Sequence, residues 1–269
     1  MIPNLNNKHR ENYTAIAINR RNQKSFTLIE LLVIACIIGI LLSTILPIIS
    51  KTILDSRKAA IANSTRQILL AYKDHIAQTN RPITEADIDT FLASKKLPKN
   101  ANAWIAYLVW QKHLSNNPKL CLASYDYMLK EVLKHDTSTK MPIKIIDNHG
   151  IMDENFATIP TCFVVCMNMA VDAPDSTPII WTRGLGTNGK WHGPQGNYHS
   201  RYARNLPHNN GNFFGQNQGG LLGFADGRVE WNNKLMDEDG NGKIFEYNQT
   251  TRTTNIIKAL PSDVVVASW

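Results

Sequence analysis

The hydrophobic and polar positions divide the chain into one long N-terminal helix and a region of shorter elements. Residues 31–49 (LLVIACIIGILLSTILPII) carry no formal charge, and apolar residues then recur at helical spacing as far as Ile76. Nothing interrupts this pattern before Asn80-Arg81-Pro82, although Pro47 should introduce a kink. The pattern predicts one helix from Phe26 to about Thr79, roughly 75 Å long.

The rest of the chain favours an α+β head with an antiparallel sheet. Thr84 and Asp87 are typical of a helix N-terminus and predict a short helix through Leu92. A second, apolar-rich helix is expected over residues 102–113. Short β-like runs separated by turn residues follow at 119–122, 142–146, 162–167, 178–182, 221–224 and 228–231. Helices followed by strands indicate the α+β class.

The apolar run has the length of a membrane span. As a helix, residues 31–49 cover roughly 28 Å, close to the thickness of a bilayer core. Basic residues precede the run, so residues 1–25 should stay cytoplasmic and the head should face the periplasm. A cleaved secretory signal peptide is the alternative, but the run is longer than a typical hydrophobic region and no A-x-A-like site follows.

These features divide the chain into four segments. We expect a cytoplasmic segment over 1–25, a transmembrane helix over 26–50, and a continuation of that helix outside the cytoplasm over 51–80. The fourth segment, 81–269, forms the head, with a long glycine-rich loop at 183–220 and an acidic loop at 237–248.

Net charge adds little about partners. The chain of 269 residues has a formal charge of +7, and five basic residues against Glu11 place +4 of it within residues 1–25. The small remainder is ordinary for a soluble head, so nucleic acid is not an expected partner.

Glu30 is unusual because a carboxylate beside an apolar run needs an interfacial position or a cationic partner. The sequence KSFTLIE at residues 24–30, followed by the apolar run, resembles the processing motif of type IV prepilins and type II secretion pseudopilins. The usual form is Gly-Phe-Thr-Leu-Ile-Glu, and Ser25 stands in place of its Gly. Gly39 and Pro47 also fall where such pilins commonly carry these residues.

The resemblance implies a pathway and a set of partners. A prepilin peptidase would cut between Ser25 and Phe26 and methylate the new amine, which Glu30 of a neighbouring subunit would neutralise on assembly. The implied partners are that peptidase, other copies of the chain and related pseudopilins, an inner-membrane assembly platform and membrane lipid.

A second resemblance lies near the C-terminus. Residues 224–229 (FADGRV) resemble an element of pilin-like proteins that carry a His-x9-Asp-Gly motif. Here His208 precedes Asp226 by 18 residues, so the motif's spacing is not kept. Asp226-Gly227 also predicts a two-residue hairpin turn on its own.

The acidic loop offers a calcium pattern. Asp237, Asp239 and Asn241 occupy positions 1, 3 and 5 of an EF-hand-like loop, and the Lys243 carbonyl would take position 7. Position 12 is Asn248, so Glu246 would have to supply the missing carboxylate. The alternative is an ordinary acidic surface turn, while the resemblance adds that major pseudopilins carry a calcium loop near the C-terminus.

Cysteines and histidines give weaker signals. Three cysteines of the head are disulfide candidates: Cys121, Cys162 and Cys166. On one strand, Cys162 and Cys166 would lie roughly 13 Å apart, so either would pair with Cys121, and buried reduced thiols remain the alternative. The spacings of His192, His199 and His208 match no zinc pattern, and no hydrolase or nucleotide-binding motif is present.

Three functions therefore compete. The favoured one is a structural, non-enzymatic subunit of a type II secretion pseudopilus or type IV pilus-like filament, polymerised through its N-terminal helix. The second is a membrane-anchored module that binds a glycan or another ligand through the 183–220 loop. The third, an anchored hydrolase, is supported only by scattered His and Asp residues.

Overall fold

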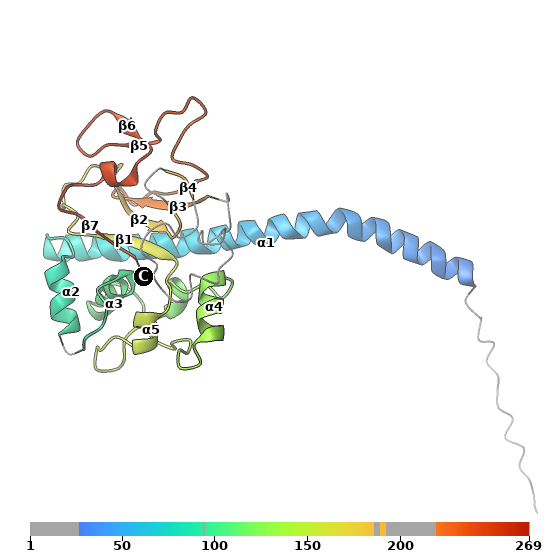
Figure 1. Ribbon diagram of the computed structural model, residues 1–269, viewed down its shortest axis with the longest axis horizontal. Helices are drawn as coiled ribbons and strands as arrows, with labels where there is room; N and C mark the ends of the chain where they lie inside the picture. The colour runs from blue at the N-terminus through green and yellow to red at the C-terminus, as the bar shows by residue number, and fades with distance from the viewer. Residues whose placement is uncertain (1–26, 94, 186–188, 192–218, 269) are drawn as a thin grey trace, which may run out of the picture. The chain divides into compact units, whose positions relative to one another are not determined.

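The computed structural model describes residues 27–93, 95–185, 189–191 and 219–268 (Figure 1). The chain forms two units, residues 1–54 and 55–269, and helix α1 (Leu28–Thr79) runs through the boundary between them. The 52-residue α1 confirms the predicted long helix and continues through Pro47.

The second unit, residues 55–269, contains the rest of the secondary structure and confirms the α+β class. After α1 the chain forms, in order, α2 (Glu85–Leu92), α3 (Ala101–Trp110), the 3₁₀ helix η1 (Pro118–Leu120), α4 (Tyr127–His135), α5 (Glu154–Thr158), β1 (Phe163–Met167), β2 (Pro178–Thr182), β3 (Gly220–Phe224), β4 (Val229–Asn232), β5 (Ile244–Phe245), β6 (Arg252–Thr253), the 3₁₀ helix η3 (Ile256–Ala259) and β7 (Val265–Ala267).

Five strands form one antiparallel sheet in the order β4-β3-β2-β1-β7, and β5 and β6 pair separately. Trp181 of β2 lies opposite Val164 of β1 and Leu222 of β3, which sets the register of the central strands. Every residue of β1, β2 and β3 is buried. Both faces of the central sheet are therefore covered, which explains why these strands read as continuous apolar runs.

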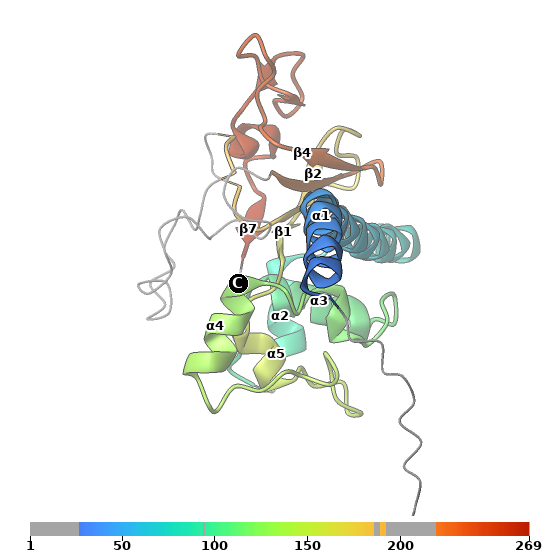
Figure 2. The ribbon, with the colours of Figure 1, turned by 90° about the vertical axis from the view of Figure 1, so that its right-hand side faces the viewer.

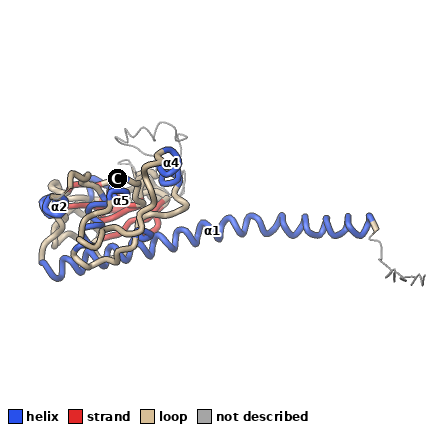
Figure 3. Tube along the Cα trace, turned by 90° about the horizontal axis from the view of Figure 1, so that it is seen from below, coloured by secondary structure: helices blue, strands red, loops and turns tan. Residues whose placement is uncertain are grey.

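Within the second unit, the C-terminal part of α1 lies between the sheet and the layer of short helices (Figures 1 and 2). On the sheet side, a Cβ added at Gly223 would come within 2.6 Å of Leu69 Cδ1, so a glycine is needed for this approach. On the helical side, the rings of Tyr72 and Trp104 lie 5.4 Å apart. Figure 3 shows the same layers from below.

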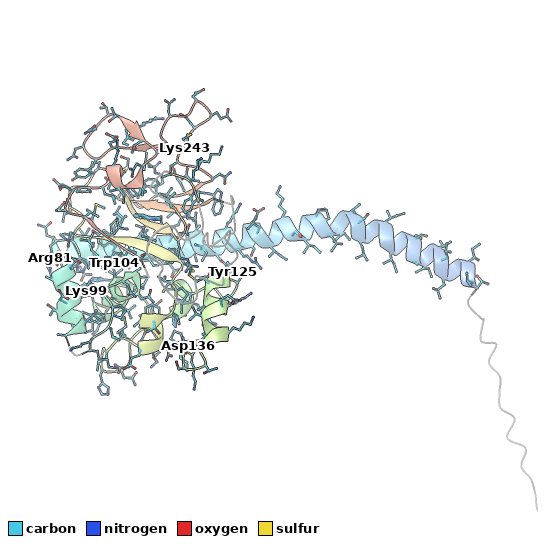
Figure 4. The ribbon with its side chains drawn as sticks, in the orientation of Figure 1. Arg81, Lys99, Trp104, Tyr125, Asp136 and Lys243 are labelled. Carbon is cyan, nitrogen blue, oxygen red and sulfur yellow. The ribbon has the colours of Figure 1, made fainter. Side chains whose placement is uncertain are left out.

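Two adjacent cations of α1 lie against aromatic rings of the head. The Arg57 guanidinium is 4.8 Å from the ring centroid of Tyr125, and the Lys58 ammonium is 4.2 Å from that of Trp231. The Tyr125 hydroxyl also donates to the Arg57 carbonyl over 3.2 Å. Figure 4 labels Tyr125 and the buried Trp104. These contacts hold α1 from both of its sides in the second unit.

Several predicted elements are confirmed. Helix α2 begins with a capping box between Thr84 and Asp87, and α3 begins at an Asn100 cap and is buried throughout residues 101–109. Strands β1 to β4 lie within one residue of their predicted limits.

Two predicted strands are wrong. Residues 119–122 fall instead at η1, because Pro118 fixes a helical φ and the Asn117 side chain accepts from the Lys119 N–H. Residues 142–146 contribute only a single bridge, from Ile146 to Met152. The backbone N–H groups of Ile145 and Ile146 donate instead to the side-chain oxygen of Asn116.

The β3–β4 hairpin is present, but its turn differs from the predicted two-residue form. Gly227 N–H donates to the Phe224 carbonyl, and Phe224 N–H donates to the Arg228 carbonyl. Gly227 has a φ of 93°, whereas Asp226 is absent from the residues with positive φ. The turn is therefore a three-residue loop with glycine in the left-handed position.

Candidate functional site: the N-terminal end of helix α1

The first turn of α1 is closed by a reciprocal pair of hydrogen bonds. The Glu30 backbone N–H donates to the Thr27 hydroxyl oxygen over 3.2 Å. The Thr27 backbone N–H and hydroxyl both donate to Glu30 Oε2, over 2.8 and 2.9 Å. This is a capping box, which satisfies donors that a helix N-terminus otherwise leaves unpaired.

The capping box explains part of the motif in local terms. Threonine followed three residues later by glutamate is the spacing that the box requires, and Leu28 and Ile29 between them begin the apolar surface. The role of Thr27 becomes clear only from the structure, although the T-x-x-E spacing alone signals it. Ser25 and Phe26, the predicted processing residues, lie outside the described residues.

The surface that follows Glu30 is apolar on every side. Within residues 28–53, where Glu30 and Lys51 are the charged residues, the large exposed hydrophobic side chains are Leu28, Ile29, Leu31, Leu32, Val33, Ile34, Ile37, Ile38, Ile40, Leu41, Leu42, Ile45, Leu46, Ile48, Ile49 and Ile53. Of the helices that the structure describes, α1 alone is long and apolar enough to cross a membrane. A helix that is hydrophobic all round needs lipid or other protein around it.

Polar side chains inside this surface bond to their own helix. Ser43 and Thr44 donate to the carbonyls of Ile40 and Leu41 over 2.7 and 2.9 Å. Ser50 and Thr52 donate to the carbonyls of Leu46 and Ile48. Their hydroxyls are thereby satisfied without water, as an apolar solvent requires.

The residues predicted to bind calcium lie around a turn at 237–242. Asn241 N–H donates to Asp237 Oδ1 over 2.7 Å, and Asp237 N–H donates to the Asn241 carbonyl over 2.9 Å. Gly240 has a φ of 85° and Gly242 lies against the backbone of Thr253. The turn and β6 border one open, polar hollow.

Charges in this hollow are mixed. Glu246 Oε1 lies 3.4 Å from Lys258 Nζ, and Arg252 also lines the hollow, its guanidinium 5.2 Å from the Phe245 ring centroid. Asp239 and Lys243 are exposed. Across the described residues, no group of three or more His, Cys, Asp or Glu side chains could hold a metal ion. Calcium at this loop stays a prediction, with side-chain oxygens of Asp237, Asp239 and Asn241, the Lys243 carbonyl and Glu246 as the expected ligands.

The cysteine candidates fall in the core. Cys121, Cys162 and Cys166 are buried and carry free thiols, and Cys36 is exposed on α1. Burial raises the pKa of each buried thiol. Cys162 N–H donates to the Cys121 carbonyl over 2.9 Å, so the structure brings these two residues together.

The glycine-rich loop is described only at its two ends. Leu185 and Trp191 form a bridge, Trp191 is buried, and a Cβ on Gly220 would come within 2.4 Å of the Trp191 ring. His192, His199 and His208 lie outside the described residues, as do residues 186–188 and 192–218 of the loop predicted to bind ligands.

A buried ion pair that the sequence does not predict lies at the start of this loop. Arg183 donates to both carboxylate oxygens of Asp126, over 2.7 and 2.8 Å, and to the Thr161 carbonyl over 2.9 Å. Both side chains are 2% exposed. Asp126 also caps α4 by accepting from the Met128 N–H. The pair joins residues 57 positions apart, and no local pattern signals it.

Comparison with known proteins gives one match. The family model of the prokaryotic N-terminal methylation motif matches residues 20–46, which include the predicted cleavage position, Glu30 and most of the apolar run. It does not reach the element at 224–229, whose resemblance is not shown. No curated protein and no solved structure matches the chain. The match to the methylation motif, together with the capped first turn and the long apolar helix that follows it, supports the resemblance to type IV pilin-like proteins.

Proposed function

We propose that the chain is a structural subunit of a type II secretion pseudopilus or a type IV pilus-like filament. The observation that carries this proposal is the methylation motif on a helix whose residues 28–53 expose apolar side chains on all sides. Such a helix can be anchored in lipid before assembly and packed against other copies afterwards, because both surroundings are apolar. The role is structural rather than enzymatic.

The proposed pathway begins at the membrane. Residues 1–25 form the cytoplasmic leader, 26–50 span the inner membrane, and 51–80 continue α1 into the periplasm, where 81–269 form the head. Prepilin peptidase removes the leader and methylates the Phe26 amine. Related pseudopilins and an inner-membrane assembly platform are the further partners, and the finished filament lies in the periplasm or outside the cell.

Glu30 has a defined part in this proposal. The capping box holds its carboxylate in the first turn of α1, four residues along the chain from the amine that cleavage would create at Phe26. A neighbouring subunit's amine would pair with this carboxylate, so two isolated charges in an apolar phase become one ion pair. The pairing favours assembly over the free subunit.

Processing is tested by the mass of the full chain. The chain is expressed with an active prepilin peptidase and, as the control, with an inactive variant of the same enzyme. The proposal requires a product that begins at Phe26 with a methylated amine, seen only with the active enzyme. Cleavage after Ser43 or Ser50 would instead indicate a conventional signal peptide.

A further inference from the structure

Two cysteines from distant parts of the head meet in its interior. Cys121 follows η1, Cys162 precedes β1, and neither is exposed to solvent. Cys162 N–H donates to the Cys121 carbonyl over 2.9 Å, and the Thr161 hydroxyl donates to the same oxygen over 3.3 Å. Residues paired across strands by backbone hydrogen bonds have Cα atoms about 5.5 Å apart, and a disulfide needs about 4.4–6.8 Å, so this contact is compatible with a disulfide.

The environment of the Cys162 sulfur supports the same pairing. Burial raises the pKa of the Cys162 thiol; the nearby Cys121 thiol adds to this rise, and the backbone N–H of Ala123, two residues after Cys121, opposes it. The sulfur of Cys162 therefore faces the segment that carries Cys121.

Cys166 is the less suitable partner. It lies on β1 four residues beyond Cys162, a separation of about 13 Å along a strand. Its thiol contacts the Pro178 carbonyl of β2 at 3.8 Å, and its backbone is opposite Val266 of β7. Its surroundings are thus the sheet rather than the segment after η1.

We propose that Cys121 and Cys162 form a structural disulfide in the mature head, and that Cys166 remains a thiol. The two thiols lose two protons and two electrons to the disulfide of a thiol oxidase, which becomes a dithiol as the S–S bond forms. Burial raises the pKa of both thiols, so exchange takes place during folding, before the two segments close around them. The bond would tie together the two ends of the segment that contains α4 and α5.

This inference rests on the proposed position of the head in an oxidising compartment. The full chain is extracted from membranes without reductant and denatured in the presence of N-ethylmaleimide, which labels free thiols. The intact mass of the chain then gives the number of labels. We expect two labels, on Cys36 and Cys166, and four labels after reduction. Protease added to spheroplasts reports separately whether the head is outside the cytoplasm.

Single variants identify the pair. Cys121→Ala and Cys162→Ala should each take up three labels, whereas Cys166→Ala should take up one and keep the disulfide. Three labels on Cys166→Ala with one on Cys162→Ala would overturn the assignment of Cys162. Four labels on a wild-type chain whose head is open to protease overturn the disulfide alone. Four labels with a protected head overturn both the disulfide and the proposed location.

Discussion

The Thr27 hydroxyl donates to Glu30 Oε2 over 2.9 Å and accepts from the Glu30 backbone N–H over 3.2 Å. The Glu30 carboxylate therefore does two things: it accepts the hydrogen bonds that cap its own helix, and it carries a negative charge that can pair with another chain. Substitutions at Thr27 and Glu30 can separate the cap from the charge.

We expect Glu30→Leu to insert in the membrane normally, because it removes a carboxylate from the apolar segment. Its incorporation into filaments should fall sharply, because the Phe26 amine loses its partner. Glu30→Gln keeps an acceptor for Thr27 and loses only the charge, so it should fail in assembly as well.

The matched variant Thr27→Val keeps the charge and loses the side-chain cap, at a cost of about 1 kcal/mol in helix stability. It should assemble better than either Glu30 variant. Equal incorporation of Glu30→Gln and wild type would contradict the charge-pairing account.

The buried pair of Arg183 and Asp126 should be required for a stable head. Arg183→Met leaves a buried carboxylate without its cation, and we expect a loss of about 3–5 kcal/mol in the free energy of unfolding. Asp126→Asn should be similarly harmful, since it strands the guanidinium and weakens the cap of α4. Denaturant unfolding of the full chain in detergent measures these losses.

A double variant provides the control for this pair. Because each single substitution strands a charge, Arg183→Met combined with Asp126→Asn should cost less than the sum of the two single losses. Additive losses would mean that the two side chains contribute independently, against the geometry.

The sequence predicts the long elements well and the short or non-local features poorly. Helix α1 and strands β1 to β4 carry sustained apolar patterns, which decide their identity without help from distant contacts. Helix α4 was missed although Asp126 caps it and buried Met128, Leu129 and Val132 repeat at helical spacing, because the surrounding turn residues favoured strands.

The local features of the site could be predicted from the sequence, and the non-local ones could not. The Thr27–Glu30 cap is local, so four consecutive residues contain its whole signal. The hydrogen bond between the backbones of Cys121 and Cys162 depends on how the chain after η1 packs against the start of β1. Only the fold determines this packing. Cysteine count alone could not separate Cys162 from Cys166.

His75 should make the head sensitive to mild acid. Its ring is fully buried and, within the described residues, neither ring nitrogen has a hydrogen-bond partner. Burial, followed by the positive charges of His113 and Arg81, lowers the pKa of His75, while Asp87 and Asp74 act in the opposite direction. The folded state thus disfavours the proton that the unfolded chain accepts near pH 6.5. Stability should be complete above that pH and decrease as the pH falls toward the folded pKa.

Thermal unfolding of the full chain between pH 5 and 7.5 measures this effect. His75→Phe should flatten the decrease, because it removes the titrating ring from an aromatic site beside Tyr107. His149→Gln is the matched control, since His149 is exposed, and it should leave the slope unchanged. The pKa of Asp74 is lowered by hydrogen bonds from His113 and Gln78, so its contribution is lost only near pH 4 and below. An unaltered slope in His75→Phe would refute the assignment.

Calcium binding at the acidic turn should be weak. The affinity class of extracellular modules is about 10⁻³ M, and 10 mM calcium would then stabilise the folded chain by about 1.4 kcal/mol and raise its melting temperature. Asp237→Ala with Asp239→Ala should abolish the rise, whereas Glu238→Ala, in the same turn but outside the ligand pattern, should retain it. Magnesium should substitute poorly. A melting temperature indifferent to calcium and to chelator would leave the turn a purely structural element.

If the processed chain polymerises through its N-terminal helix, it should be recovered in filaments. Cells that express the chain with a prepilin peptidase and an assembly platform are sheared, and the filament fraction is analysed by mass. We predict chains that begin at Phe26 in this fraction from wild type and their loss from Glu30→Leu. A processed chain that remains wholly in the membrane fraction, in cells that assemble other pilins, would contradict the account and favour a membrane-anchored binding module.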